Sequence, residues 1–462
     1  MRLRDKLRGA PSPVAPRRGE PEPPPGRGPD DGPSVGARPL GSNGARFGQD
    51  GGGAAHEPGP DSPERSDRIE HLRALIGEVA ARERRRSPAV HGEPQSLPVG
   101  EARENAHGEL HLIERWLDPD HCHGRVPVGG ALGVDAGLVA RLSLDPELGE
   151  VDLSRMLILD TETTGLAGGA GTVPFLVGLA YFDDGVLKVE QLFLRNFGQE
   201  APLLAHLAER VAQASCLVSY NGKSFDWPLL RARFVMNRVP MPEVPPHLDL
   251  LHCARRVLRP RMAGVRLTAV EQELLGFHRE GDVDGSLIPG LYLGYLRGAD
   301  PRSLLPVLEH NEHDVIALAA ILARLCEHFA EVKPEDDPRD HLAYAQVALR
   351  ARDLERAEGF ARAAAEGGGE VGVSAQAHGL AAKVARRRGD ARAAAEAWQR
   401  ALQVAPCELT AAEAHCALAK LYEHALKDLR RARAHARMTM PAEGPVAHGR
   451  RLGRLHRRLL RP

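Results

Sequence analysis

Residues 156–166 read MLILDTETTGL, an apolar run that ends in two closely spaced acids. The run predicts a short buried strand, and the period of two of a strand points Asp160 and Glu162 out of the same face. Two carboxylates held so close repel each other, and a divalent cation bound by oxygen ligands is the usual relief. The same letters also fit polar residues at a strand-to-turn boundary closed by Gly165. The pair therefore indicates a metal site only if the chain supplies further carboxylates.

The segments after this stretch predict a mixed sheet. Residues 174–182 (PFLVGLAYF) and 186–196 (VLKVEQLFLRN) alternate like strands, and a short turn joins them. With the first strand they predict a three-stranded antiparallel meander. Leucines at helical spacing predict a helix over 202–214, and CLVSY at 216–220 reads as a buried strand parallel to the first.

The remainder of this region is predicted to be mostly helical. We expect a long last helix from about residue 302 to 329, bent near Pro306. The other predicted helices cover residues 227–237, 249–258, 267–276 and 287–296.

Two further acids and a histidine lie in the predicted helices. Asp226 begins a helix just after the buried strand, where a helix cap is the simpler alternative to a metal ligand. His310 and Asp314 are four residues apart in the last helix and so lie on one face, within an otherwise apolar stripe. Polar groups in such a stripe are costly to bury without partners, although His310 also fits a hydrogen-bonded core histidine.

Composition and charge exclude several classes of protein. The chain has 462 residues, of which 42% are hydrophobic and 27% charged, enough for cores in two or three domains. A formal net charge of -1 leaves any nucleic-acid-binding surface to a local patch. The six cysteines form no CxxC pair, the N-terminus lacks the apolar core of a signal peptide, and no run reaches membrane-spanning length. We therefore expect a cytoplasmic protein with reduced thiols and no contact with a membrane.

Shifts in composition suggest five segments. Proline, glycine and arginine dominate residues 1–61, which predict a disordered tail, and residues 62–100 predict an amphipathic helix followed by a linker. Residues 101–330 hold the predicted sheet and its helices. Alanine-rich helical repeats are expected over 340–445, and 446–462 form a basic tail that either touches nucleic acid or is a solvated helix end.

The alanine-rich region is self-similar. Asp353, Asp390 and Asp428 recur in equivalent places, 37 and 38 residues apart, which predicts helix-turn-helix units. The pattern resembles tetratricopeptide repeats, which run to about 34 residues and end helix pairs in a proline, as Pro406 does here. A generic helical bundle is the alternative, because the match to the consensus is loose.

Five stretches of the chain carry family-specific motifs: LDTETTGL, FLVGLAYF, YNGKSFDWPLL, LGF.RE.DVDGSLIPGLY and HNEHDV. Together they resemble the bacterial YprB-like ribonuclease-H-like family. The resemblance covers roughly residues 157–325, about a third of the chain. This family is a branch of the DEDD exonuclease superfamily, so the resemblance implies an α/β ribonuclease-H-like domain with a mixed sheet, an antiparallel meander plus parallel strands. The superfamily commonly has Tyr four residues before the last Asp or His five before it, whereas this chain has His310 at the first spacing and Glu309 at the second.

The resemblance also implies a two-metal hydrolysis of phosphodiester bonds with two Mg²⁺ or Mn²⁺ ions. By analogy Asp160 bridges both metals, Glu162 and Asp314 complete the site that activates water, and Asp226 holds the second metal. His310 would orient or deprotonate the attacking water.

Substrate contacts are less sharply indicated. Lys223, close to Asp226 in the sequence, is the best candidate for a phosphate contact, and Asn311 either contacts substrate or makes structural hydrogen bonds.

These features lead to two hypotheses of function. The first is a metal-dependent nuclease, a 3′-to-5′ exonuclease on single-stranded DNA or RNA. The alternative is a non-catalytic nucleic-acid-binding scaffold that recruits a protein partner through its helical repeats.

Overall fold

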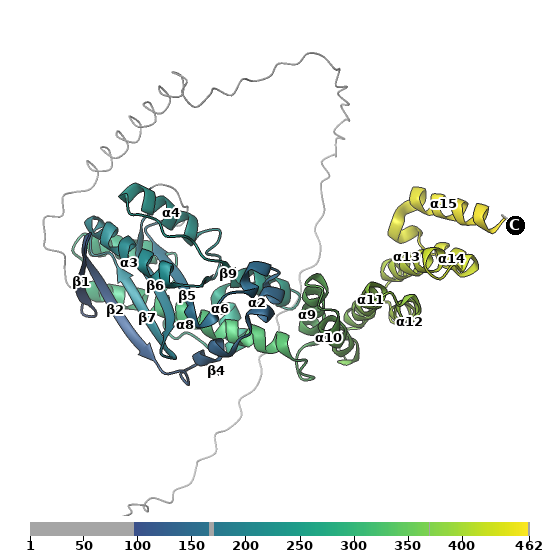
Figure 1. Cartoon of the computed structure of the whole chain (residues 1–462), viewed down its shortest axis with the longest axis horizontal. Coiled ribbons are helices and arrows are strands. Elements are labelled where there is room, and N and C mark those ends of the chain that lie inside the picture. The colour runs from purple at the N-terminus through teal and green to yellow at the C-terminus, as the bar shows by residue number, and fades with distance from the viewer. Residues whose placement is uncertain (1–96, 166–170, 369, 461–462) are drawn as a thin grey trace, which may run out of the picture. The chain divides into compact units, whose positions relative to one another are not determined.

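The computed structural model describes residues 97–165, 171–368 and 370–460 of the chain (Figure 1). The predicted tail over 1–61, the predicted helix that follows it and most of the glycine-rich loop after residue 165 lie outside these ranges.

Within the described residues, seven strands form one mixed sheet in the order β1-β2-β7-β6-β5-β8-β9. β5, β6 and β7 pair antiparallel and β8 runs parallel to β5, which confirms the predicted meander and parallel strand. The strands are β1 (Glu101–Asn105), β2 (Gly108–Leu117), β5 (Met156–Thr163), β6 (Pro174–Asp183), β7 (Val186–Phe193), β8 (Cys216–Ser219) and β9 (His247–Asp249), and a separate pair is formed by β3 (Cys122–His123) and β4 (Val126–Pro127).

An edge strand was not predicted from the sequence. Glu101–Asn105 forms β1, which pairs antiparallel with β2 from Glu101 opposite Leu112 to Asn105 opposite Gly108. Its side chains are mostly exposed and carry no apolar alternation. An edge strand is held by backbone pairing on one side only, so its sequence need not show a buried face.

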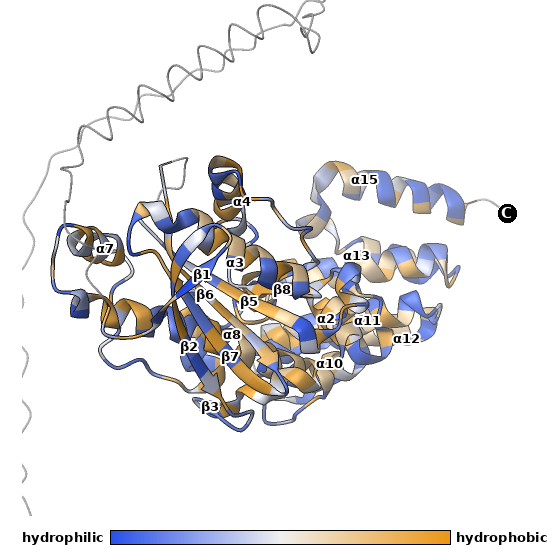
Figure 2. Ribbon diagram, turned by 60° about the vertical axis from the view of Figure 1, so that its left-hand side comes forward, coloured by the Kyte–Doolittle hydropathy of each residue, from blue (hydrophilic) through white to orange (hydrophobic). Residues whose placement is uncertain are grey.

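Helices cover both faces of the sheet, and alternate residues of β5 enter different cores. Met156 and Ile158 belong to the core that includes α8 (Leu305–Ala330). Leu157 and Leu159 belong to the core that includes α3 (Glu200–Gln213) and α4 (Asp226–Asn237). Figure 2 shows hydrophobic residues concentrated in the central strands, as a sheet buried on both faces requires. The remaining helices of this region are α2 (Ala136–Ser143), α5 (Leu250–Val257), α6 (Leu267–Val270), which continues into a π-helical turn (Glu271–Leu275), and α7 (Ile288–Leu296), with short 3-10 turns at Val128–Gly133, Pro146–Gly149, Leu153–Arg155, Phe197–Gln199 and Pro301–Leu304.

The long last helix begins later than predicted and is not bent at Pro306. A 3-10 turn covers Pro301–Leu304, and α8 starts at Leu305 with Pro306 in its first turn. The first N–H groups of a helix have no partner inside the helix, so a proline there removes no hydrogen bond. The proline therefore marks the start of the helix.

Three helical hairpins follow α8, which confirms a helical C-terminal region. Asp353, Asp390 and Asp428 are the N-caps of the second helix in each hairpin, and each side chain accepts the backbone N–H three residues further on. This shared capping role explains their regular spacing. The hairpins are α9 (Pro338–Arg350) with α10 (Leu354–Glu366), α11 (Val371–Arg387) with α12 (Ala391–Gln403), and α13 (Glu408–His424) with α14 (Leu429–Ala436).

Most of the expected basic tail over 446–462 is part of a packed helix. α15 (Met440–Leu459), interrupted at Gly444, buries Leu455 against α13 and α14. Arg454 and Arg458 bind the buried carboxylate of Glu423, and the hydrogen bond from Arg454 lowers the pKa of Glu423 to about 2. The arginines that suggested a solvated or nucleic-acid-binding tail are partly used to hold this helix on the last hairpin.

Two other predictions concern reduced thiols and the absence of membrane contact. All six cysteines are described, and all are free thiols. No helix in the described ranges is long and apolar enough to cross a membrane. The cytoplasmic location stays a prediction.

The capping role of the repeated aspartates predicts a local loss of stability. Replacing Asp390 with Ala removes the acceptor for the Ala393 N–H and should cost the start of α12 about 1 kcal/mol. Hydrogen exchange of the α12 amides, followed by mass spectrometry, should accelerate by roughly fivefold. Asp390→Asn is the matched control because asparagine caps equally well. Equal exchange in the two variants would contradict the capping role.

Candidate metal centre

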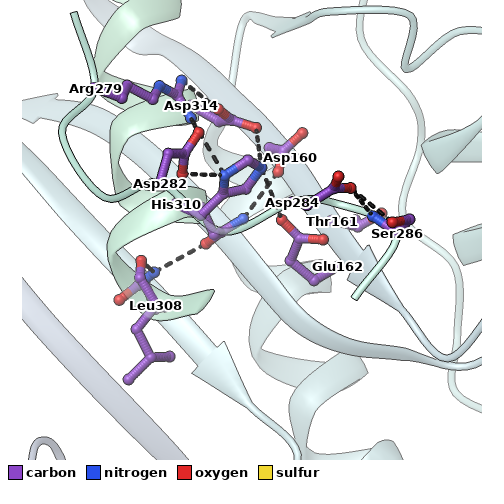
Figure 3. A network of polar contacts seen from close by, with 12 residues as sticks. Asp160, Thr161, Glu162, Arg279, Asp282, Asp284, Ser286, Leu308, His310 and Asp314 are labelled. Atoms are coloured by element: carbon purple, nitrogen blue, oxygen red, sulfur yellow. Dashed lines mark hydrogen bonds and ion pairs between the residues drawn. The ribbon is translucent and has the colours of Figure 1, made fainter. Parts of the chain in front are cut away.

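β5 carries the first two acids to the rim of the sheet. Asp160 lies opposite Gly178 of β6, and Glu162 lies opposite Leu176, where the pairing of β5 and β6 becomes irregular. The two residues are on the face of β5 that looks toward α8, as the alternation of the strand requires (Figure 3). The side chains of His310 and Asp314 meet them from α8.

A buried asparagine fixes the orientation of Asp160. Asn311 donates from Nδ2 to Asp160 Oδ2 at 2.9 Å, and its Oδ1 accepts from Gln191 Nε2 at 3.0 Å. Gln191 also donates to the Leu308 carbonyl at 2.7 Å, so β7, α8 and β5 are tied together at this point. Asn311 is 0% exposed. Asn311 thus makes the structural hydrogen bonds that were one of its two predicted roles, and its substrate contact stays a prediction.

A glycine makes room for this asparagine. A Cβ added to Gly178 would lie 2.3 Å from Asn311 Oδ1, closer than any real contact. An isolated glycine within a strand pattern often marks such a close approach, which is the signal that the sequence reading did not use. Gly178 and Gln191 were both missed as supports of the site.

Asp226 reaches the site from the other face of the sheet. It is the first residue of α4, whose N-cap is Phe225, so the capping alternative does not describe it. Asp226 is 5% exposed, and its carboxylate accepts a hydrogen bond from the hydroxyl of Thr161, which lies between the two acids of β5. Burial raises the pKa of Asp226 to about 6, although the bond from Thr161 opposes the shift.

The side chains on α8 are held by a loop that the sequence reading left as a connection. Asp282 Oδ1 lies 2.7 Å from His310 Nδ1, and Arg279 Nη2 donates to Asp314 Oδ1 at 2.5 Å. Arg279 also donates from Nε to Glu271 Oε2 at 2.8 Å, and its side chain is 5% exposed. His123 Nε2 contacts the other Glu271 oxygen at 2.7 Å. Arg279 and Asp282 both lie in the string at residues 275–292 that carried the family resemblance, so a signal was present.

The acids of the site perturb one another. Burial first, and then the charges of Asp314 and Asp226, raise the pKa of Asp160 and of Glu162 well above its usual range. Burial also raises the pKa of Asp314, against the opposing charges of Arg279 and His310. Ligand atoms of Glu162, His310 and Asp314 lie within 4.8 Å of one another. Crowded carboxylates of this kind fit a hard divalent cation, which would neutralise them.

Lys223 has a different environment. Its Nζ lies 3.5 Å from Asp145 Oδ2, and its backbone N–H donates to Asp249 Oδ2 at 3.3 Å. Asp249 caps α5 and also accepts the Asn221 N–H. The structure thus brings together Asp160, Glu162, Asp226, His310 and Asp314, and pairs Lys223 with an acid outside that group.

The close approach at Gly178 predicts the effect of adding one methyl group. Gly178→Ala should displace Asn311 from Asp160 and lower the free energy of unfolding by about 1–3 kcal/mol. The matched control is Gly290→Ala in α7, where an added Cβ meets nothing within 4 Å and the expected change is under about 1 kcal/mol. Urea unfolding measures both. A Gly178→Ala protein as stable as the control would contradict the packing described here.

The raised carboxyl pKa values predict how metal binding depends on pH. At this site the metal-free folded protein keeps protons that the unfolded chain has lost. The contribution of the site to the free energy of unfolding should therefore fall as the pH rises from about 4 through the Asp226 pKa of about 6. A cation binds the ionised carboxylates and offsets that loss. The rise in Tm produced by Mn²⁺ should therefore be larger at about pH 7.5 than at about pH 5.

Asp160→Asn should remove most of this metal-dependent rise. Asp184→Asn, in the exposed turn between β6 and β7, should retain it. A rise in Tm that does not change with pH, or that survives in Asp160→Asn, would place the bound metal elsewhere.

Comparisons with known proteins agree with this geometry. A family model described as RNase_H superfamily matches residues 157–326, which include all four acids. The Bacillus subtilis (strain 168) protein named "Uncharacterized protein YprB" is 38% identical over 197 residues, and the match covers 42% of this chain and 47% of that protein. The chain thus spans about half the length of this relative. The part of the chain over residues 157–326 is therefore a ribonuclease-H-like domain.

Proposed function

We propose that the protein is a metal-dependent nuclease, a 3′-to-5′ exonuclease that hydrolyses phosphodiester bonds of single-stranded DNA or RNA. The observation that carries the proposal is the convergence of Asp160, Glu162, Asp226 and Asp314 from β5, α4 and α8. Their mutual repulsion has no function in a purely structural core, where such groups would be replaced at a gain in stability. The ribonuclease-H-like domain supports the same conclusion.

Two divalent ions, Mg²⁺ or Mn²⁺, fit the donor set. Glu162 and Asp314 would hold one ion, Asp226 would hold the other, and Asp160 would contact both. When bound, such ions supply a nucleophilic hydroxide near neutral pH and the counter-charge for the developing phosphorane. The protein's own groups keep the ligands in place, because Asn311 fixes one oxygen of Asp160 and Arg279 fixes one oxygen of Asp314.

Other parts of the chain have roles that stay predictions. Lys223 is 39% exposed at its side chain and paired only loosely with Asp145, so a phosphate could displace that contact. Binding of a protein partner by the helical hairpins is a further prediction. It belongs with the alternative function, a scaffold that binds nucleic acid without cleaving it.

Replacing Asp160 should distinguish the nuclease from the non-catalytic scaffold. Asp160→Asn keeps the shape of the side chain but removes a charge on which both metal positions depend, so metal-dependent cleavage should fall by at least about 100-fold. The assay uses labelled single-stranded DNA and RNA oligonucleotides with Mn²⁺ or Mg²⁺, each blocked at the 5′ or the 3′ end. Asp184→Asn is the matched control, since it removes an exposed aspartate whose positive φ of 49° asparagine tolerates.

The pattern of products decides among the alternatives. Release of mononucleotides blocked by a 3′ cap supports the proposed polarity. Wild-type protein that binds oligonucleotides but releases no product with either metal would support the scaffold. Full activity in Asp160→Asn would show that the acids described here are not the active site.

A further inference from the structure

His310 lies between two sets of carboxylates. Its Nδ1 faces Asp282 Oδ1 at 2.7 Å, and its Nε2 faces Glu162 Oε1 at 3.8 Å and Asp314 Oδ2 at 3.7 Å (Figure 3). The first distance is that of a hydrogen bond. The other two are longer than a hydrogen bond.

The short contact determines which nitrogen carries the proton. A carboxylate can only accept, so Nδ1 donates its proton to Asp282. Arg279 Nη1 also lies near Nδ1, but at 3.5 Å it is the weaker neighbour. In the neutral ring the lone pair is then on Nε2, directed at the Glu162 and Asp314 oxygens.

The two longer distances suit ligands of one ion. Ligand atoms that each lie about 2.1 Å from the same cation are at most about 4.2 Å apart, and both Nε2 distances fall within this limit. Arg279 holds Oδ1 of Asp314, which leaves Oδ2, the oxygen nearer His310, for the ion. The ligand atoms of Glu162, His310 and Asp314 all lie within 4.8 Å of one another, so the three side chains face one region.

We propose that His310 Nε2 is a metal ligand together with Glu162 and Asp314, and that Asp282 is the positioning residue that turns this nitrogen toward the ion. The proposal rests on the proposed function for the presence of a metal, and it assigns His310 to the cation instead of to the attacking water. An imidazole ligand suits first-row transition metals better than Mg²⁺, which prefers oxygen. The site should accordingly select Mn²⁺ over Mg²⁺.

Pulsed electron paramagnetic resonance of the Mn²⁺-loaded full-length protein tests the nitrogen ligand directly. The wild-type spectrum should contain ¹⁴N modulation, and histidine labelled with ¹⁵N should change it. His310→Ala should remove the modulation, and His310→Gln is a second variant that keeps a polar side chain if the first does not fold. His107→Ala, in the exposed turn between β1 and β2, should leave the spectrum unchanged.

Calorimetric titration with Mn²⁺ and with Mg²⁺ tests the positioning residue. Asp282→Ala should weaken Mn²⁺ binding by about 10–100-fold and reduce the preference for Mn²⁺ over Mg²⁺. Asp284→Ala is the matched control, because the side chain of this aspartate, in the same loop, accepts hydrogen bonds from the Ser286 backbone N–H and hydroxyl. Unchanged Mn²⁺ affinity in Asp282→Ala would contradict the positioning role proposed for Asp282.

The outcomes separate this inference from the proposed nuclease activity. Bound Mn²⁺ without ¹⁴N modulation, modulation that survives in both His310 variants, or no Mn²⁺ binding at all would overturn the inference. Cleavage of oligonucleotides by a protein whose Mn²⁺ has only oxygen ligands would support the nuclease activity and contradict the inference. Nitrogen-ligated Mn²⁺ without cleavage would support the inference and contradict the nuclease activity.

Discussion

The mutual repulsion of the carboxylates at the end of β5 is the constraint on which the site depends. Asp160 and Glu162 are neighbours on one face of a strand, and Asp314 and Asp226 are brought to them from helices on opposite faces of the sheet. Their charges and their burial raise the pKa of each of these acids. An arrangement of this kind persists only if the surrounding fold is stable enough to hold it.

The surrounding contacts show how the fold holds these groups. Asn311 donates to Asp160 and is itself held by Gln191, and Gly178 leaves the space that Asn311 fills. On the other side Arg279 supplies a positive charge to Asp314 and shares Glu271 with His123. These contacts orient single oxygen atoms, which is the requirement for selective metal coordination.

The position of α8 in turn depends on the hydrophobic cores. The helix is buried against the sheet over most of its length, and its end continues into the first helical hairpin. Phe329 stacks on Tyr344 at a ring-centroid distance of 5.7 Å and on Phe360 at 6.2 Å. Arg261, after α5, binds the buried Asp340 of α9 at 2.7 Å. The first hairpin therefore shares a core with the ribonuclease-H-like domain, at the end of the helix that carries His310 and Asp314.

The sequence by itself determined most of the elements and the four candidate acids, because these follow from local patterns. Alternation predicted β5, β6 and β7, the spacing of four placed His310 and Asp314 on one face, and the repeated aspartates predicted helix-turn-helix units. Only the tertiary structure decided what holds those acids. Gly178 and Asn311, or Asp282 and His310, are far apart in the chain, and their contact depends on how the strands and helices pack. The same reason explains β1 and α15, since an edge strand and a basic helix are stabilised by partners that no local pattern reveals.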